Sequence, residues 1–412
     1  MNIRLTKSFY GWIIVTVAAL VAFSSGPGQS YTFSVFIDSM IAEFNLSRTD
    51  ISGLYAIGTG ISAAMVMVVS RLADKYGPKA MIIVTVSCLT LSCMGMAFVT
   101  GGISFFLAFA GLRAFGQGSI PINATLITAQ WFVRMRGRAM AVMGLGFASS
   151  MAFMPILARA LIDNLSWRVA YVVIGILIWM VVVPVSAYFL RNTPEEMNLY
   201  PDGSASPPEG EIVPDHIVIS DRRKVLTSVT FWGLAVPLSV PGFVSTALVF
   251  HQSAIFVERG MSLTMAASVF LPISASALAA SILSGFLVDK IGPRTLFYIS
   301  TTILLTSICA ISIAQSLQVA IVYAVILGAS NGTGQIVSNV LWAHYYGRQG
   351  LGRIQGSASM VMIAASAIGP LPLAIMHAIT GRFTEGILLM CALPISAVII
   401  MAAVKTDNIQ RT

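Results

Sequence analysis

The decapeptide SRLADKYGPK, residues 70–79, returns in modified form as GFLVDKIGPR at residues 285–294. Seven of the ten positions match in kind, and the copies lie 215 residues apart in a chain of 412 residues. Each copy follows one apolar segment and precedes another. A charged turn that repeats at half the chain length indicates that the chain is built from two related halves.

The composition places both halves in lipid. Apolar residues make up 57% of the chain and charged residues 10%, whereas a soluble domain averages about 25% charged residues. Segments in lipid must be helical, because an isolated strand would leave its backbone groups unsatisfied. The sequence therefore predicts an all-α membrane protein of twelve transmembrane helices. Their expected limits are residues 10–36, 52–70, 80–99, 104–131, 139–161, 169–190, 230–257, 265–287, 295–314, 318–344, 355–377 and 383–404.

The basic residues predict the orientation. Eighteen of the 24 Lys and Arg residues fall in segments that lie inside if the N-terminus is inside, five fall in the opposite loops, and Arg113 lies within a span. This bias favours cytoplasmic N- and C-termini. The net charge of +8 follows from this topology and needs no nucleic-acid partner. We expect a monomeric, multi-pass protein of the plasma membrane, of the bacterial inner-membrane type, whose partners are membrane lipid and a small-molecule substrate.

One polar stretch separates the two halves. It begins at Arg191 and contains PDGSASPPEGE, a composition typical of a flexible linker. We expect a six-helix bundle at residues 1–190, a cytoplasmic linker at 191–228 and a second six-helix bundle at 229–412. The opening FYGW at residues 9–12 matches FWGL at 231–234, which supports the same division.

The motifs resemble those of the major facilitator superfamily over essentially the whole chain. Residues 70–79 and 285–294 resemble its signature G-x-L-a-D-[RK]-x-G-[RK]-[RK] between spans two and three, and RAFGQG at 113–118 resembles its span-four signature R-x-x-x-G-x-G. FYGW and the stretch WFVRMRGRAMAVMGLGFASS, residues 131–150, resemble the monocarboxylate and oxalate–formate transporter branch. The resemblance implies two pseudo-symmetric bundles that transport a solute by alternating access.

The repeated turn is the candidate gate. Asp74 and Asp289 are expected against the N-terminal ends of spans eleven and five, where a helix dipole stabilises a carboxylate by about 0.3–1 kcal/mol. Together with the resemblance, this predicts a latch that closes the inner side. An alternative, in which the loop only fixes topology, explains the basic residues but not the repeated aspartate. The predicted gating residues are Asp74, Lys75, Gly77, Arg136, Arg138, Asp289, Lys290, Gly292 and Arg294.

Polar residues inside the spans are the candidates for a substrate site. Arg113 and Gln117 lie one turn apart, and Asn331, Gln335 and Asn339 share one helix face. An equal alternative is that these amides only hydrogen-bond between helices and that Arg113 bonds neighbouring carbonyls. The predicted substrate-binding residues are Arg113, Gln117, Asn331, Gln335, Asn339, Gln29, Tyr31 and Asn123.

His251 is the predicted proton-coupling residue, because the ordinary pKa of histidine, about 6.5, lies near neutrality. It corresponds to Gln29 at the offset of 222 residues that relates spans one and seven. The Gly- and Pro-containing stretches at residues 26–28 and 237–242 predict breaks in these two spans. The acidic residues of the spans lie at outer ends: Asp38, Asp163 and Glu258.

The predicted function is secondary active transport of a small organic solute. The resemblance implies an organic anion such as a monocarboxylate, moved in symport with a proton. Spans eight and eleven lack the Lys or Arg that carboxylate-binding members of that branch often place there. Export of a drug or amphipathic metabolite is therefore the second interpretation, and a non-transporting receptor on the same fold the third. The sequence contains no G-x-x-x-x-G-K-[ST] loop, so we expect no ATP-driven transport. No nucleophile–base pair and no metal-ligand spacing is found, and no C-x-x-C pair occurs, so we expect no enzyme, catalytic residue, metal or cofactor.

Overall fold

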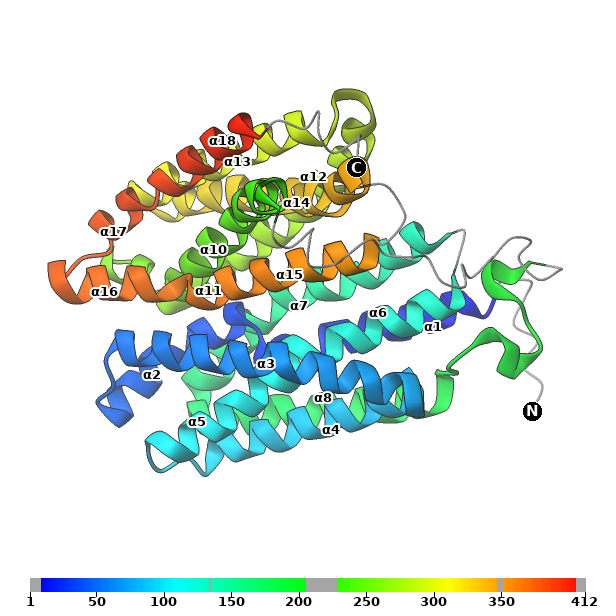
Figure 1. Ribbon diagram of the computed structural model, residues 1–412. Helices are drawn as coiled ribbons and strands as arrows, with labels where there is room; N and C mark the ends of the chain where they lie inside the picture. The colour runs from blue at the N-terminus through cyan, green and yellow to red at the C-terminus, as the bar shows by residue number, and fades with distance from the viewer. Residues whose placement is uncertain (1–8, 133–134, 205–227, 347–350, 405–412) are drawn as a thin grey trace. The chain divides into compact units, whose positions relative to one another are not determined.

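The structure is a computed structural model that describes residues 9–132, 135–204, 228–346 and 351–404. Within these residues, twelve helical stretches are long and apolar enough to cross a membrane. Figure 1 shows them as coiled ribbons. The predicted fold, an all-α membrane protein with twelve spans, is confirmed.

Contacts divide the chain into two compact units. Unit 1 holds the described residues of 1–33 and 61–213, and unit 2 holds those of 34–60 and 214–412. Two helices run from one unit into the other, namely α2 (Ser30–Phe44) and α3 (Arg48–Tyr76). Residues 34–60, at the α2–α3 turn, therefore pack with the second six spans.

Unit 1 is built mainly from spans one and three to six. Its elements are α1 (Gly11–Phe23), η1 (Gly26–Gly28), α4 (Pro78–Ala97), α5 (Gly102–Gly111), η2 (Leu112–Ser119), α6 (Ile120–Trp131), α7 (Arg136–Asn164), α8 (Trp167–Phe189), η3 (Pro194–Met197) and η4 (Pro201–Gly203). The predicted break in span one is confirmed, because the 3-10 turn η1 separates α1 from α2. Span four is also irregular, since its middle, η2, is π-helical.

Unit 2 contains the last six spans. Its elements are α10 (Val229–Glu258), α11 (Leu263–Ser268), α12 (Phe270–Ile291), α13 (Pro293–Ser312), α14 (Leu317–Tyr346), α15 (Leu351–Ile368), α16 (Pro370–Thr380), α17 (Thr384–Leu389) and α18 (Ala392–Ala403). The predicted break in span seven is wrong, because α10 continues through Pro237 and Pro241. Neighbouring helices can satisfy the carbonyl groups that a proline frees inside a membrane span.

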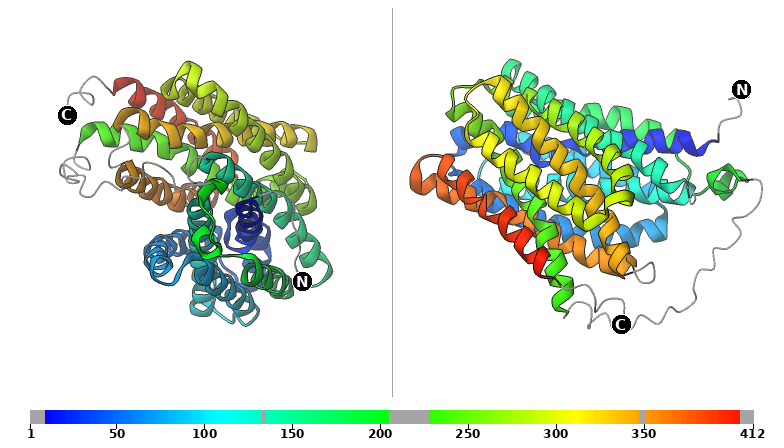
Figure 2. Two further views of the ribbon diagram at one scale, coloured as in Figure 1. Left: turned by 90° about the vertical axis from the view of Figure 1, so that its right-hand side faces the viewer. Right: turned by 90° about the horizontal axis from the view of Figure 1, so that it is seen from above.

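Small residues allow close helix contacts inside each unit. In unit 2, Gly328 and Gly332 of α14 lie against the backbone carbonyls of Ile273 and Ala277 on α12. Figure 2 shows α12 to α14, coloured yellow to orange, side by side. In unit 1, Gly175 of α8 lies against α4, where a Cβ would be 2.7 Å from the Cβ of Cys93. Small residues at such interfaces are typical of membrane bundles.

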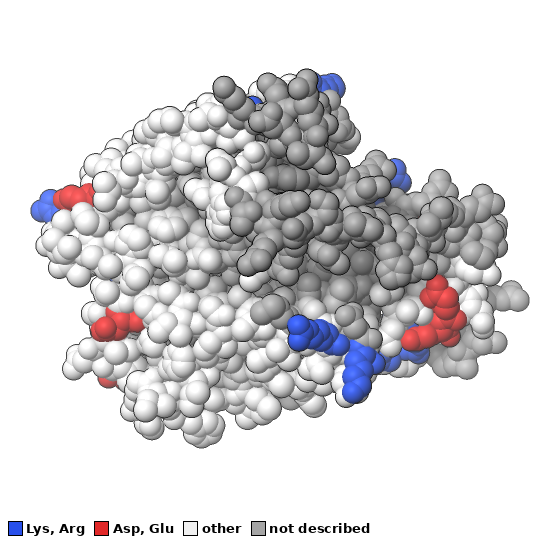
Figure 3. Space-filling view, in the orientation of Figure 1, with Lys and Arg blue, Asp and Glu red and all other residues white. Residues whose placement is uncertain are grey.

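Charged and uncharged side chains lie on different parts of the surface. Figure 3 shows uncharged side chains over the middle of the helices, with Lys, Arg, Asp and Glu side chains near helix ends. Exposed large apolar residues occur along many of the spans, for example Leu107, Met180 and Phe286. These side chains are suited to contact lipid tails rather than water.

Candidate transport site

Arg113 lies in the π-helical segment η2 and is fully buried. Its Nη1 donates a 2.7 Å hydrogen bond to the backbone carbonyl of Gly28 in η1. Gly28 and Gly116 permit this approach, since a Cβ on Gly116 would lie 2.7 Å from the Cα of Gly28. The guanidinium therefore holds the broken part of span one against span four, which is the structural alternative considered for this residue.

Two predicted amide side chains follow Arg113 along span four. Gln117 is half-buried, and its Oε1 has no hydrogen-bond partner among the described residues. Asn123 is fully buried, and its Nδ2 donates a 2.9 Å bond to the carbonyl of Ser119, whereas its Oδ1 lacks a described partner. Each amide oxygen is therefore an acceptor that a bound donor can satisfy.

The predicted residues of span one bind within unit 1. The Nε2 of Gln29 donates to the Oγ of Ser25 at 3.3 Å. The Tyr31 hydroxyl donates to the Oγ of Ser150 at 3.0 Å and so joins α2 to α7. These contacts give both side chains a packing role in this conformation.

The three amides predicted on one face of span ten are Asn331, Gln335 and Asn339, and the structure describes the contacts of the first. The Oδ1 of Asn331 accepts a 2.6 Å bond from the Ser245 hydroxyl, which joins α14 to α10. Gln335 is exposed, and the side chain of Asn339 lies outside the described residues. The interhelical role therefore holds for Asn331, while the binding role of Gln335 and Asn339 stays a prediction.

A pocket in unit 2 has residues that the sequence did not single out as a set. It contains about 370 Å³ of space free of protein atoms, part of which is open solvent, and lies between α10, α14 and α15. Its lining residues are Ala235, Leu238, Ser239, Ser338, Trp342, Ala358, Ser359 and Met362. Among these lining residues none carries a charge, and each helix contributes at least one serine or tryptophan.

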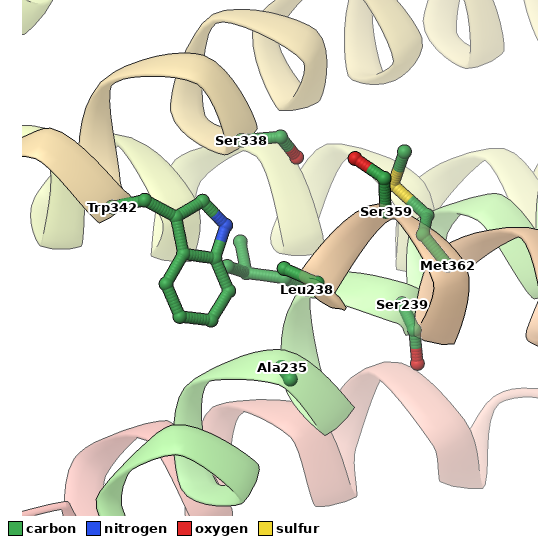
Figure 4. A pocket seen from close by; sticks show the side chains of 8 residues that line it. Ala235, Leu238, Ser239, Ser338, Trp342, Ser359 and Met362 are labelled. Carbon is green, nitrogen blue, oxygen red and sulfur yellow. The ribbon is translucent and has the colours of Figure 1, made fainter. Parts of the chain in front are cut away.

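Figure 4 shows how the polar groups of this pocket lie. The Trp342 indole stands on one side, and the hydroxyls of Ser338 and Ser359 point toward one another. The Ser239 hydroxyl instead donates a 2.7 Å bond to the carbonyl of Val236 within its own helix. The signal that could have found this set is the i, i+4 spacing of Ser338 and Trp342 on one face of span ten.

His251 is buried in α10, with 1% of its surface exposed. Its Nε2 lies 3.0 Å from the carbonyl of Pro370, which begins α16. A carbonyl oxygen only accepts, so the imidazole proton resides on Nε2. The Nδ1 atom has no described partner. This geometry ties α10 to α16, and a role of His251 in proton coupling stays a prediction.

The two repeated turns share one backbone geometry. Gly77 has φ +84° and Gly292 has φ +78°, values that glycine adopts readily, and a proline begins the next helix in each copy. Lys75, Lys290 and Arg138 are exposed. The side chains of Asp74, Arg136 and Asp289 lie outside the described residues. Their contacts with spans five and eleven stay predictions.

Arg294 has a structural role that the sequence did not suggest. Its Nη2 donates to the carbonyls of Met401, Ala402 and Val404, at 2.5, 3.1 and 3.2 Å. These carbonyls belong to the C-terminal end of α18, which a cation stabilises. The basic position of the second turn thus joins α13 to the end of span twelve.

The start of the linker is folded onto unit 1. The Tyr10 hydroxyl donates to the carbonyl of Phe189 at 2.8 Å, and burial raises the pKa of this hydroxyl. The Oδ1 of Asn192 accepts the Lys79 backbone N–H at 3.0 Å, at the start of α4. The Oδ1 of Asp202 accepts the Met135 backbone N–H at 3.0 Å, at the start of α7. Here a linker carboxylate occupies a helix N-terminus like those proposed for the repeated aspartates.

The described residues contain no group of three His, Cys, Asp or Glu side chains that could hold a metal ion. The polar side chains described above inside the spans include amides, hydroxyls, the Trp342 indole, the His251 imidazole and the buried Arg113 guanidinium. Such groups bind organic solutes through hydrogen bonds and ring contacts.

Comparisons with known proteins agree with this arrangement. The crystal structure of a bacterial homologue of the human lysosomal transporter Spinster, in an inward-facing and unoccupied conformation, matches with a TM-score of 0.75 at 16% identity, over 98% of each chain. The aspyridones efflux protein of Emericella nidulans is 25% identical over 87% of this chain and 70% of its own. The 3-(3-hydroxy-phenyl)propionate transporter of Escherichia coli is 24% identical over 84% and 82%.

A shorter match links the chain to the branch that the sequence resembles. Monocarboxylate transporter 13 of Bos taurus is 26% identical over 41% of this chain and 39% of its own. The family profile described as Major Facilitator Superfamily matches residues 18–370 and 255–408, which is nearly the whole chain. This multi-pass membrane protein therefore belongs to the Major Facilitator Superfamily of transporters.

Proposed function

We propose that the protein transports a small, ring-bearing organic acid by alternating access, in symport with a proton. The observation that carries this proposal is the uncharged pocket of unit 2, with an indole beside two facing hydroxyls. Trp342 is 2% exposed and contacts the Phe231 ring, with centroids 5.5 Å apart. The part of its indole that lines the pocket is the apolar surface on which a ring can stack. Leu238 and Met362 extend that surface, and methionine adapts to irregular ligand shapes.

The hydroxyls supply the polar end of the site. The Ser338 hydroxyl can donate one hydrogen bond to a carboxyl or hydroxyl oxygen of the solute. Since no basic side chain lines the pocket, a carboxylate there would lack a counter-charge, and burial of an unpaired charge is costly. Binding of the acid together with a proton removes that cost, which favours symport.

The printed names of relatives support the same class of solute. They include a 3-(3-hydroxy-phenyl)propionate transporter, a putative niacin/nicotinamide transporter of Bacillus subtilis and a monocarboxylate transporter. Two of these solutes carry a ring, and the third is a class of carboxylates. A ring-bearing monocarboxylate satisfies both features of the pocket.

Efflux of a neutral amphipathic metabolite is the second candidate. The lining of the pocket is equally suited to an uncharged ring compound, because its hydroxyls bind amides and alcohols as well as acids. The aspyridones efflux protein is a relative over most of the chain. The fully buried Arg113 also favours this candidate, since its guanidinium is bound to a protein carbonyl.

The two candidates separate in a binding assay with matched ligands. Purified protein is titrated with 3-phenylpropionate and 3-phenylpropionamide at pH 5.5 and pH 7.5, and dissociation constants are compared. The first proposal predicts that the affinity for the acid rises at the lower pH, where a larger share of the acid is protonated, while the affinity for the amide stays constant. Equal affinities for acid and amide at both pH values would favour the neutral-solute candidate.

Trp342 provides the test of the pocket itself. Trp342→Phe should retain most of the affinity for the preferred ligand. Trp342→Ala should lower the affinity by about 5- to 150-fold, because stacking of a flat ring on an aromatic side chain contributes about 1–3 kcal/mol. Trp179→Ala is the control, since that indole lies on the exposed face of α8 and donates to Ser87. Unchanged binding by Trp342→Ala would remove this pocket from the proposal.

We further propose that the linker side is cytoplasmic and that the protein is a monomer of the bacterial inner membrane. The excess of basic residues on the linker side supports this orientation. The latch of residues 70–79 and 285–294 belongs to the same proposal, supported by the shared positive φ of Gly77 and Gly292. Protease access to a tag at either terminus, from outside intact cells, tests the orientation.

A further inference from the structure

One aromatic ring joins three helices at the end of unit 2 that lies opposite the linker. This ring is Phe383, just before α17, and it is 1% exposed. The Arg48 guanidinium carbon lies 5.9 Å from the ring centroid, within the range of a cation–π contact. The His377 imidazole lies against Phe383 with ring centroids 4.2 Å apart and planes inclined by 32°. Phe383 thus contacts a permanent cation from α3 and a titratable base from α16.

Glu258 completes this cluster from α10. Its Oε2 lies 3.7 Å from the Nε2 of His377. Its two carboxylate oxygens accept long hydrogen bonds, 3.3 and 3.4 Å, from the backbone N–H of Phe383. The side chains of Glu258 and His377 are each 29% exposed, so protons from solution can reach them. The carboxylate is placed to pair with an imidazolium at position 377.

Other charged groups nearby face elsewhere. Asp38 of α2 pairs with Arg48 at 2.5 Å. His251 also touches Phe383, with centroids 5.3 Å apart, but it is buried and bound to a carbonyl of α16. Arg259 donates to carbonyls at the end of α13. Two exposed residues flank the ring in the chain: Arg382 and Glu385. Among the described residues, Glu258 and Arg48 are therefore the charges directed at His377.

The face of α3 that carries Arg48 also packs against α10, at Phe250. Tyr55 is 1% exposed, and its ring lies 4.7 Å from that of Phe250 in a T-shaped arrangement. Arg48, Ser52 and Tyr55 are spaced i, i+4, i+7 and so share one helix face. Ser52 is fully buried. A separation of α3 from α10 and α16 would expose this face to solvent.

We propose that His377 accepts a proton during the transport cycle and that its protonation releases α3 from Phe383. An imidazolium would gain a charge-assisted pair with Glu258. The same positive charge would repel the Arg48 guanidinium, which contacts the same ring, and so weaken the cation–π contact. The closed arrangement is then favoured above the pKa of His377 and lost as the pH falls through it. The role in transport rests on the proposed proton symport, but the opening itself needs no substrate.

Labelling of a cysteine on the buried face of α3 tests the opening. Ser52→Cys is introduced into a variant in which the native cysteines are replaced by alanine: Cys88, Cys93, Cys309 and Cys391. The rate of modification by a thiosulfonate reagent is measured between pH 5 and pH 8, without substrate. Each rate is divided by that of the unfolded protein at the same pH, because the thiolate fraction itself depends on pH. We expect the relative rate to rise several-fold as the pH falls from 8 to 5.

Variants of the cluster assign this dependence to a residue. His377→Gln should keep the rate low at every pH, and Arg48→Gln should make it high at every pH. Glu258→Gln should move the midpoint to lower pH, because the imidazolium loses its carboxylate partner. His344→Gln is the matched control and should leave the curve unchanged, because His344 is an exposed histidine in the last turn of α14. Size-exclusion chromatography verifies that each variant is folded and monodisperse.

Two results would overturn the proposal. The first is a pH dependence of labelling in His377→Gln that equals that of the parent, and the second is an unshifted midpoint in Glu258→Gln. A flat curve in His251→Gln would assign the proton to His251 instead. None of these outcomes depends on the identity of the solute. The labelling test therefore remains valid even if the binding assay excludes ring-bearing acids as the solute.

Discussion

Replacing Gly332 by alanine should separate α12 from α14, whereas the same change at Gly334, two residues further along α14, should not. A Cβ on Gly332 would lie 2.9 Å from both the carbonyl carbon of Ala277 and the backbone nitrogen of Ser281, and closer still to the Ala277 oxygen. Ordinary contact begins at 3.4 Å. The Ala277 oxygen is the closest of these atoms, so the backbone of α12 must move by about 1 Å or more, because backbone atoms have no rotamer to change. A Cβ on Gly334 would meet nothing within 4 Å.

The paired design isolates the steric cost. Each substitution gains about 1 kcal/mol of helix propensity, so this gain cancels when the two variants are compared. Overpacking costs about 1–3 kcal/mol, which is then the expected difference in unfolding free energy between Gly334→Ala and Gly332→Ala. At about 2–4 °C per kcal/mol for a unit of this size, the melting temperatures should differ by about 2–12 °C.

Thermal unfolding of the purified protein in detergent, followed by circular dichroism, measures this difference. Unit 1 offers an independent pair on α7, since a Cβ on Gly146 would lie 2.7 Å from the carbonyl carbon of Ala19, while one on Gly144 would meet nothing within 4 Å. We expect Gly146→Ala to melt below Gly144→Ala for the same reason. Equal melting temperatures within each pair would refute the close helix packing described for both units.

Two further variants test polar contacts in unit 1. Asp202→Ala should lower the unfolding free energy by about 1 kcal/mol, because the Met135 N–H at the start of α7 loses its acceptor; a melting temperature equal to that of the wild type would show that this contact does not form. Arg113→Gln should reduce the yield of monodisperse protein and destabilise it by about 1–3 kcal/mol, because the buried carbonyl of Gly28 loses its donor. A stable, monodisperse Arg113→Gln protein that loses only affinity for acids would instead assign Arg113 to the solute, as the sequence allowed.

The sequence by itself determined the number of spans and the family. Lipid excludes most charges and requires helices, so long apolar segments such as residues 169–190 identify spans without knowledge of any contact. The repeated turns at residues 70–79 and 285–294 carried the family resemblance, because their glycines and prolines are required by local backbone geometry. The break at η1 followed from Gly and Pro in the same way.

Only the tertiary structure decided which polar groups meet. Helical periodicity gives the face of a helix on which a residue lies but not the helix that packs there. From the sequence, Asn331 could bind either a solute or another helix, and Arg113 could bind either an anion or a backbone carbonyl. The structure places Ser245 beside Asn331 and the Gly28 carbonyl beside Arg113. The continuity of α10 through Pro237 depended likewise on surrounding helices. The pocket around Trp342 and the cluster around Phe383 each combine residues from three helices, and such combinations exist only once the helices pack.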